Sequence, residues 1–261
     1  MIHNCRYLVI IALAMFIGCV ENDSKKMDAP ESGNIRMTKP VENITPTEDQ
    51  LARRERSEAI CKSRSIPFYA NRGSLYVSPE QEVTIRQKDE VVDRALALFY
   101  IGLKSEGLEP KELEQMDKAF GISGKLSPKE EAYAKAKVPT EQQTIDANWR
   151  YEGLHVLLWA LGYVDSLRYP DKVCNVADDV KIIFDRKESG FRAKAVLRSK
   201  KEILDQVDLI LRFSWACVES DLKNMPAPGG LDKSVVIERH HALNWLINYL
   251  NQSWDDVSTD T

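Results

Sequence analysis

The sequence predicts an all-α (mainly α) fold: a single compact multi-helix domain with a buried central helix. Segment 149–164, WRYEGLHVLLWALGYV, is apolar on nearly every side of a helical wheel, so a helix there needs neighbours all round. Segments 91–103 and 203–218 repeat apolar residues at helical spacing. Several Ser or Thr residues with Glu or Gln three positions later form the capping-box pattern that begins a helix.

The first half of the domain contains signals for three further helices. Thr47 with Gln50 opens a charged helix that should end near Arg64, before a proline. Ser78 followed by a proline predicts the start of a second long helix, whose apolar face at 91–103 should pack on the central helix. The charged stretch 107–137 contains another capping box at Ser127 and is expected at the periphery.

The central helix should begin after Thr140 and end near Tyr169, because the proline at 170 disfavours helix in the residue before it. Asn175 predicts a short helix through Phe184. Residues 185–198 show no firm period, and Gly190 suggests a turn.

Two long helices are expected to complete the domain. Ser199 with Glu202 opens the helix that carries the apolar face at 203–218, where Asp208 and Arg212 are spaced to pair along a polar stripe. A proline and glycine loop then precedes a last helix at 234–251.

Residues 1–18 are typical of a signal peptide: Arg6 near the start, then an apolar run too short to span a bilayer. The sequence Phe-Ile-Gly before Cys19 resembles the lipobox of bacterial lipoproteins, which makes Cys19 the predicted lipidation site. Secretion into the periplasm after simple cleavage is the alternative. Val20 stands where signals for inner-membrane retention often have Asp, so an outer-membrane lipoprotein is expected.

Residues 19–46 are predicted to form a lipidated tether, and residues 47–261 the helical domain. The tether is poor in large apolar residues and rich in polar ones and proline. The whole chain is 43% apolar, enough for a core, and its formal charge of -4 mixes both signs, which argues against a nucleic-acid partner. Cys61, Cys174 and Cys217 remain after processing; we expect buried free thiols, with one disulfide as the alternative.

Charged residues on the central and last helices are the main candidates for a site. Glu152 and His155, and likewise Glu238 and His241, lie one helical turn apart, as in the two Glu-x-x-His helices of di-iron bundles. These four residues are a candidate metal set. Glu152, His155, Glu238 and Arg239 are the candidate catalytic residues of an acid-base site between the same helices.

A structural explanation is favoured over both kinds of site. A buried charge without a partner costs several kcal/mol, so Arg150, Glu152, Glu238 and Arg239 should pair across the two helices. The adjacent His240 and His241 are interpreted as surface residues. A calcium site at Asp255, Asp256 and Asp260 is disfavoured because the spacing is not that of an EF-hand.

Three segments together, WRYEGLHVLLWALGYV, LRSKKEILDQVDLILRFSWA and ERHHALNWLINYLNQSWDDVSTDT, resemble the bacterial family called domain of unknown function 4272, here in a lipoprotein form. The resemblance covers residues 47–261. It implies one helical domain and assigns no catalytic residue.

The expected function is that of a lipid-anchored cell-envelope protein, a binding or structural module that meets a protein or glycan at the membrane. No GxSxG elbow, Walker loop or dinucleotide motif is present in the sequence, so no cofactor is expected and an enzyme is disfavoured. The alternative is an enzyme with a metal or acid-base site between the helices at 149–164 and 234–251. An immunity-type protein that neutralises a toxin is a weaker alternative.

Overall fold

The computed structural model describes residues 43–261, of which Thr45–Thr261 forms one compact unit. The predicted signal peptide, Cys19 and most of the predicted tether lie outside the described residues. Residues 43–261 contain eight α-helices, three short 3-10 helices and no strand, which confirms the all-α prediction. The α-helices are α2 (Glu48–Ser63), α3 (Lys88–Ser105), α4 (Pro110–Phe120), α5 (Pro128–Lys135), α6 (Glu141–Ala160), α7 (Val176–Lys194), α8 (Lys200–Leu222) and α9 (Lys233–Leu246).

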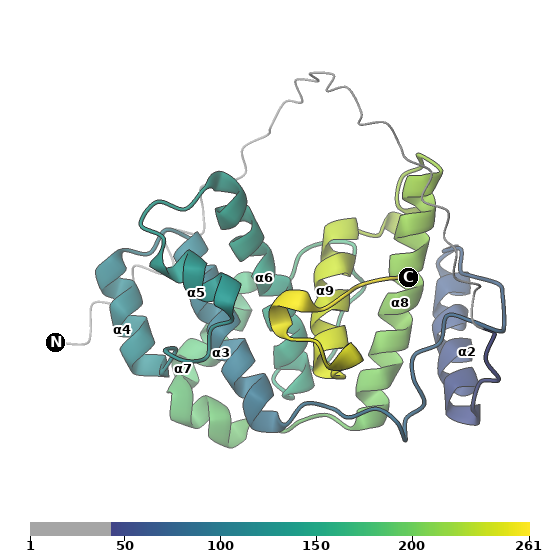
Figure 1. The fold of residues 1–261 in the computed structure, drawn as a ribbon, viewed down its shortest axis with the longest axis horizontal. Coiled ribbons are helices and arrows are strands. Elements are labelled where there is room, and N and C mark those ends of the chain that lie inside the picture. Colours follow the sequence, from purple (N-terminus) through teal and green to yellow (C-terminus); the bar gives the residue numbers. More distant parts are fainter. Residues whose placement is uncertain (1–42) are drawn as a thin grey trace. The chain divides into compact units, whose positions relative to one another are not determined.

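Five of these helices pack side by side in the spatial order α3, α6, α9, α8, α2 (Figure 1). Helix α7 packs on α3 and α6, while α4 and α5 cover α3 at the end of the row opposite α2. The row order differs from the chain order because α9 returns to lie between α6 and α8. This return brings the charged residues of α6 and α9 face to face.

The central helix α6 is buried as its composition predicts. From Tyr151 to Leu161 every residue except His155 is buried. Its main neighbour is the apolar face of α3, and the two backbones approach closely at Gly102, where an added Cβ would lie 2.4 Å from the Tyr151 ring. The predicted packing of α3 on the central helix is therefore confirmed.

The predicted end of the central helix is wrong. Helix α6 ends at Ala160, well before Tyr169, and Gly162 follows in a left-handed conformation with φ of 78°. The Gly162 N–H donates to the Trp159 carbonyl at 3.0 Å and the Tyr163 N–H to the Leu158 carbonyl at 2.9 Å. This is the Schellman arrangement, in which glycine caps the helix, so Gly162 ends α6 before proline can.

The last helix is also shorter than the predicted 234–251. Helix α9 ends at Leu246, and Asn248 takes a left-handed conformation with φ of 53°. Asparagine tolerates this conformation better than most residues, which makes it a common helix terminator. The chain then turns back, and the buried ring of Trp254 packs edge-on against Trp245, so the C-terminal tail is held against α9.

Helix α3 begins at Lys88, ten residues after the predicted cap at Ser78. Its capping box is formed by Gln87, whose N–H donates to Glu90 at 3.0 Å. Residues 64–87 form a loop that buried arginines hold in place: Arg54 donates to the carbonyls of Ser74 and Tyr69 at 2.9 and 2.7 Å. These bonds satisfy loop carbonyls that a helix would have satisfied internally.

Helix α7 is longer than the predicted 175–184. Asn175 caps it as predicted, but residues 185–194 continue the helix beyond an interruption at Lys187, and Gly190 is helical. The helices predicted from the boxes at Thr47, Ser127 and Ser199 begin where expected. Asp208 and Arg212 pair at 2.8 Å on α8, but both are fully buried, so the predicted polar stripe is wrong.

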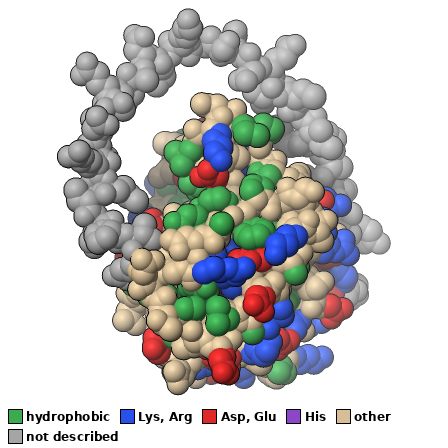
Figure 2. Space-filling view, turned by 90° about the vertical axis from the view of Figure 1, so that its right-hand side faces the viewer, with side chains coloured by type: hydrophobic (Ala, Val, Ile, Leu, Met, Phe, Trp, Pro, Cys, Tyr) green, Lys and Arg blue, Asp and Glu red, His purple; other side chains and the backbone are tan. Residues whose placement is uncertain are grey.

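Basic, acidic and apolar side chains are interspersed over the face of the domain shown in Figure 2. Among the described helices, none combines the length and the apolar character needed to span a bilayer.

Candidate functional site

The predicted site residues lie where α6 and α9 face one another. Glu152 and Arg239 are buried and form an ion pair, with Arg239 Nε donating to Glu152 Oε2 at 2.9 Å. Arg239 Nη1 also donates to the Arg168 carbonyl at 2.6 Å. The other oxygen of Glu152 accepts the backbone N–H of Cys174. Both carboxylate oxygens of Glu152 are thus already used to tie α6 to α9 and to the loop before α7.

A second ion pair joins the same two helices. Arg150 Nη1 donates to Glu238 Oε2 at 2.9 Å, and both side chains are partly buried. Burial raises the pKa of Glu238 above its ordinary value, and the charge of Arg150 opposes this shift. The predicted cross-pairing of Arg150, Glu152, Glu238 and Arg239 is confirmed in both pairs.

A cavity lies beside each of these two ion pairs, and the arginine of the pair is one of its lining residues. Arg239 borders a cavity of about 260 Å³ together with two other arginines and mainly apolar side chains. Arg150 borders a cavity of about 340 Å³. Neither Glu152 nor Glu238 lines either cavity. An acid-base site needs a carboxylate that substrate can approach, so this arrangement disfavours Glu152 and Glu238 as catalytic groups.

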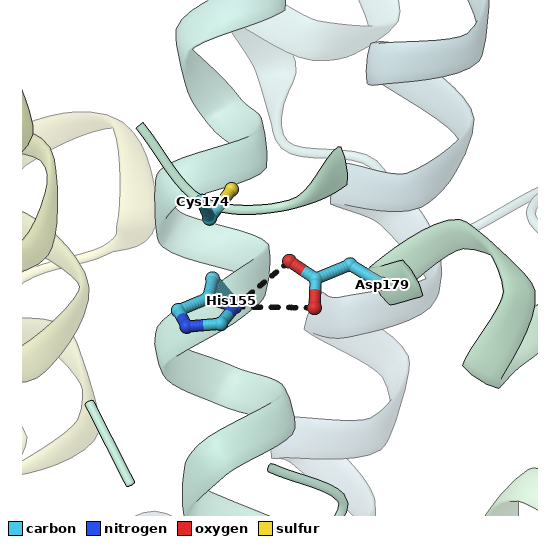
Figure 3. Close-up of side chains that lie close together, drawn as sticks. All are labelled: His155, Cys174 and Asp179. Carbon is cyan, nitrogen blue, oxygen red and sulfur yellow. Dashed lines mark hydrogen bonds and ion pairs between the residues drawn. The ribbon is translucent and has the colours of Figure 1, made fainter. Parts of the chain in front are cut away.

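The predicted metal set of Glu152, His155, Glu238 and His241 is not assembled. Within residues 43–261, the metal-ligating side chains that gather are His155, Cys174 and Asp179, and none of the other three predicted residues joins them. His155 Nδ1 lies 2.9 and 3.1 Å from the two Asp179 oxygens, and its partner comes from α7 (Figure 3). The set fails because Glu152 and Glu238 each bind an arginine instead.

The two histidines of α9 are not surface residues as predicted. His240 is 1% exposed, and His241 is half-buried with its ring edge-on to Trp254. Burial is the main cause that lowers the pKa of each to about 4; the neighbouring His241 lowers the pKa of His240 further, and the charge of Arg150 lowers that of His241 further. The helix wheel places His241 at a polar edge, but the returning tail with Trp254 covers that edge.

More charged and polar residues line the cavity beside Arg150 than line the cavity beside Arg239. It lies between α5, α6 and α9 and is bordered by the tail, and its lining residues include Glu130, Tyr133, Gln143, His241 and Trp254. Glu130 is 6% exposed; its Oε2 accepts from Arg94 and from the Ser127 N–H, whereas its Oε1 has no partner in the described part of the chain. His241 Nε2 is likewise buried without a partner among residues 43–261. Buried polar atoms normally have partners, so these two atoms mark a place for a ligand or ordered water.

Sequence reasoning missed this cavity because its walls come from distant segments. The Ser127 capping box does identify Glu130 as a capping residue, but that role accounts for only one of its oxygens. Asp255 also faces the cavity; it accepts from Ser127 Oγ at 2.6 Å and from the Lys129 N–H at 2.9 Å. These bonds give Asp255, one of the three aspartates considered for a calcium site, protein partners of its own.

The three cysteines of the described chain are free thiols, in agreement with the favoured prediction. Cys61 and Cys217 are buried, and burial raises the pKa of both to about 11. Cys174 is half-buried and lies beside Glu152 and Asp179.

Fold and site together define a class: a single all-helical domain, tied by buried ion pairs, with a polar cavity under its C-terminal tail. The family described as Domain of unknown function (DUF4272) matches residues 53–257, and the chain belongs to this family. No curated protein and no solved structure matches it.

Proposed function

We propose that this chain is a lipid-anchored protein of the bacterial cell envelope that binds a small hydroxyl-rich ligand, such as a glycan unit, in the polar cavity beside Arg150. The observation that carries the proposal is the pair of unpartnered buried atoms, Glu130 Oε1 and His241 Nε2, on residues that line one cavity. A carboxylate oxygen accepts hydrogen bonds, and the neutral imidazole offers an acceptor or a donor. A sugar hydroxyl can donate a hydrogen bond to the carboxylate oxygen, and it can donate to or accept from the imidazole nitrogen.

The size and lining of the cavity fit this class of ligand. A volume of about 340 Å³ is at the small end of ligand pockets, which suits one or two sugar units better than a larger molecule. The lining combines aromatic surface from Tyr133 and Trp254 with polar groups from Gln143 and Arg150. Ligand sites commonly have this composition, with apolar surface for contact and a few polar groups for orientation.

Binding is favoured over catalysis because the charged residues between α6 and α9 already form ion pairs with one another. Glu152 has a partner on each oxygen, and Glu238 is paired with Arg150. The cavity itself contains a neutral histidine and a carboxylate held by Arg94, without a nucleophile next to a base.

The test of the cavity is a screen of the purified full chain against soluble mono- and disaccharides, followed by calorimetry on the best binder. Glu130→Gln is expected to weaken binding roughly tenfold or more, because the amide nitrogen replaces a buried acceptor with a donor. The matched control is Glu131→Gln, the same change at the next, exposed residue, which should bind like wild type. Equal affinity in Glu130→Gln and wild type, or no binder at all, would count against the proposal.

The anchor is tested separately by feeding labelled palmitate to cells that express the chain. Wild type is expected to incorporate label and to fractionate with the outer membrane, whereas Cys19→Ala should incorporate none. The Phe-Ile-Gly-Cys sequence at 16–19 supports this expectation, and acyl chains each add about 0.8 kcal/mol of membrane affinity per buried methylene. Incorporation that persists in Cys19→Ala, or no incorporation in wild type, would refute lipidation at this cysteine.

A further inference from the structure

One nitrogen, one sulfur and one oxygen ligand converge between α6 and the start of α7 (Figure 3). His155 comes from α6, Cys174 from the loop that precedes α7, and Asp179 from the first turns of α7. One potential ligand atom from each residue lies within 4.8 Å of the other two. The three residues are brought together by tertiary structure, because a loop and the first turn of α7 separate Asp179 from the end of α6.

We propose that His155, Cys174 and Asp179 form a binding site for one divalent cation of the zinc class, independent of the ligand cavity beside Arg150. Thiolate, imidazole and carboxylate are the three ligand types that Zn²⁺ prefers. Three protein ligands leave a fourth position for water or another small ligand, as in zinc sites that are not purely structural.

The geometry requires only small movements. Metal–ligand bonds of about 2.0–2.3 Å place tetrahedral ligands roughly 3.3–3.8 Å apart. His155 Nδ1 and Asp179 are now at hydrogen-bond distance, 2.9 Å, so an ion between them would separate them slightly and draw in the sulfur. His155 and Cys174 are only partly buried, which leaves a path for an ion to enter from solvent.

The charges at the site favour a cation. The Asp179 side chain is 2% exposed, and its carboxylate lies at hydrogen-bond distance from His155 Nδ1 and beside the Cys174 thiol. Burial first, and then the carboxylates of Glu152 and Asp179, raise the pKa of the Cys174 thiol well above its ordinary value. A bound divalent cation reverses this effect, because it stabilises the thiolate directly. The ion, the thiolate and the aspartate then sum to zero net charge in a poorly solvated place.

Proton balance follows from the same ligand set. The Cys174 thiol loses its proton to solvent when sulfur binds the ion. The hydrogen bond to Asp179 places the ring proton of His155 on Nδ1, so this proton moves to Nε2 when Nδ1 binds the ion, and the ring itself releases none. Metal binding is therefore expected to release one proton from the thiol for each ion bound.

Residues already described hold the ligand loop in position. Glu152 accepts the backbone N–H of Cys174, and Arg239 holds Glu152 at 2.9 Å. Residues that hydrogen-bond to the metal ligands without binding the ion themselves fix the orientation of those ligands. The buried pair between α6 and α9 thus positions Cys174 without binding the ion.

The experiment is a titration of the chelator-treated full chain with Co²⁺ and then Zn²⁺. Wild type is expected to bind one Co²⁺ per chain, with a thiolate-to-cobalt charge-transfer band in the near ultraviolet that Zn²⁺ abolishes by displacement. Calorimetry in two buffers of different ionisation enthalpy should show the release of the thiol proton. Cys174→Ser should lose the band, and Asp179→Asn, which is nearly isosteric, should weaken Co²⁺ binding tenfold or more.

Cys217→Ser is the matched control, because Cys217 is a buried thiol that is not among the three ligands. It should keep the band and the stoichiometry. Circular dichroism reports whether each variant remains helical, and Asp179→Asn provides a second test if Cys174→Ser fails to fold. A folded wild-type chain that shows no charge-transfer band, or a band that survives in Cys174→Ser, would overturn the proposal; a failed sugar screen would not affect it.

Discussion

Replacing Arg239 by alanine is expected to lower the free energy of unfolding by about 3–5 kcal/mol. The change leaves Glu152, which is 2% exposed, as a buried carboxylate without its cation. It also removes the donor that satisfies the Arg168 carbonyl. Urea unfolding of the full chain, followed by circular dichroism, measures the effect as a shift of the midpoint at unchanged slope.

Two further variants separate the buried charge from the loss of side-chain volume. The double variant Glu152→Leu with Arg239→Met removes both charges and keeps most of the volume, so it should recover much of the lost stability. Arg192→Ala is the control for ion pairs nearer the surface: Arg192 binds Asp93 at 2.6 Å and Glu188 at 2.7 Å where solvent reaches the partners, so this change should cost less stability than Arg239→Ala. A loss of similar size in Arg239→Ala and Arg192→Ala would contradict the prediction.

Acidification from pH 6.5 to pH 4 is expected to destabilise the domain by a few kcal/mol through His240, which is buried, and His241, which is half-buried. The folded-state pKa of His240 and of His241 is lowered to about 4 from 6.5. Between these values the unfolded chain binds protons that the folded chain excludes, so stability rises with pH across this window. The stability is fully present above pH 6.5 and is lost as the pH falls through the folded pKa values.

Neighbouring charges modify this pH dependence without reversing it. Asp260 faces His240, and Arg150, Lys129 and Asp255 face His241. Glu238 acts in the opposite direction, because its pKa is raised by burial. The useful quantity is therefore the difference between wild type and His240→Gln, measured by urea unfolding at pH 7, 5.5 and 4.5. The variant should lose less stability than wild type on acidification; equal losses would show that His240 does not contribute.

Local sequence signals predicted the helices better than their ends. Capping boxes at Ser127 and Ser199 identified helix starts correctly, because the bonds they describe join residues three apart in the chain. The ends of α6 and α9 were placed too late, because Gly162 and Asn248 stop these helices through backbone conformation. Both residues were visible in the sequence. Glycine and asparagine adopt the left-handed conformation more readily than other residues, and the prediction overlooked this signal.

In the candidate site, too, some contacts could be predicted from the sequence and others could not. Opposite charges on two apolar helices were enough to predict the pairs of Glu152 with Arg239 and of Arg150 with Glu238, since a buried charge requires a partner whichever way the helices meet. The partner of His155 was not predictable, because Asp179 lies on a helix whose packing against α6 no local pattern specifies.

Apolar periodicity and the cost of a buried charge act within each segment, so the all-helical class, the burial of α6 and the need for ion pairs follow from the sequence alone. Two groupings of distant residues could be seen only in the folded chain: the cavity that Glu130, His241 and Trp254 line, and the cluster of His155, Cys174 and Asp179. Each depends on how the helices cross and on where the C-terminal tail returns. These are properties of the packed core as a whole, and no single segment specifies them.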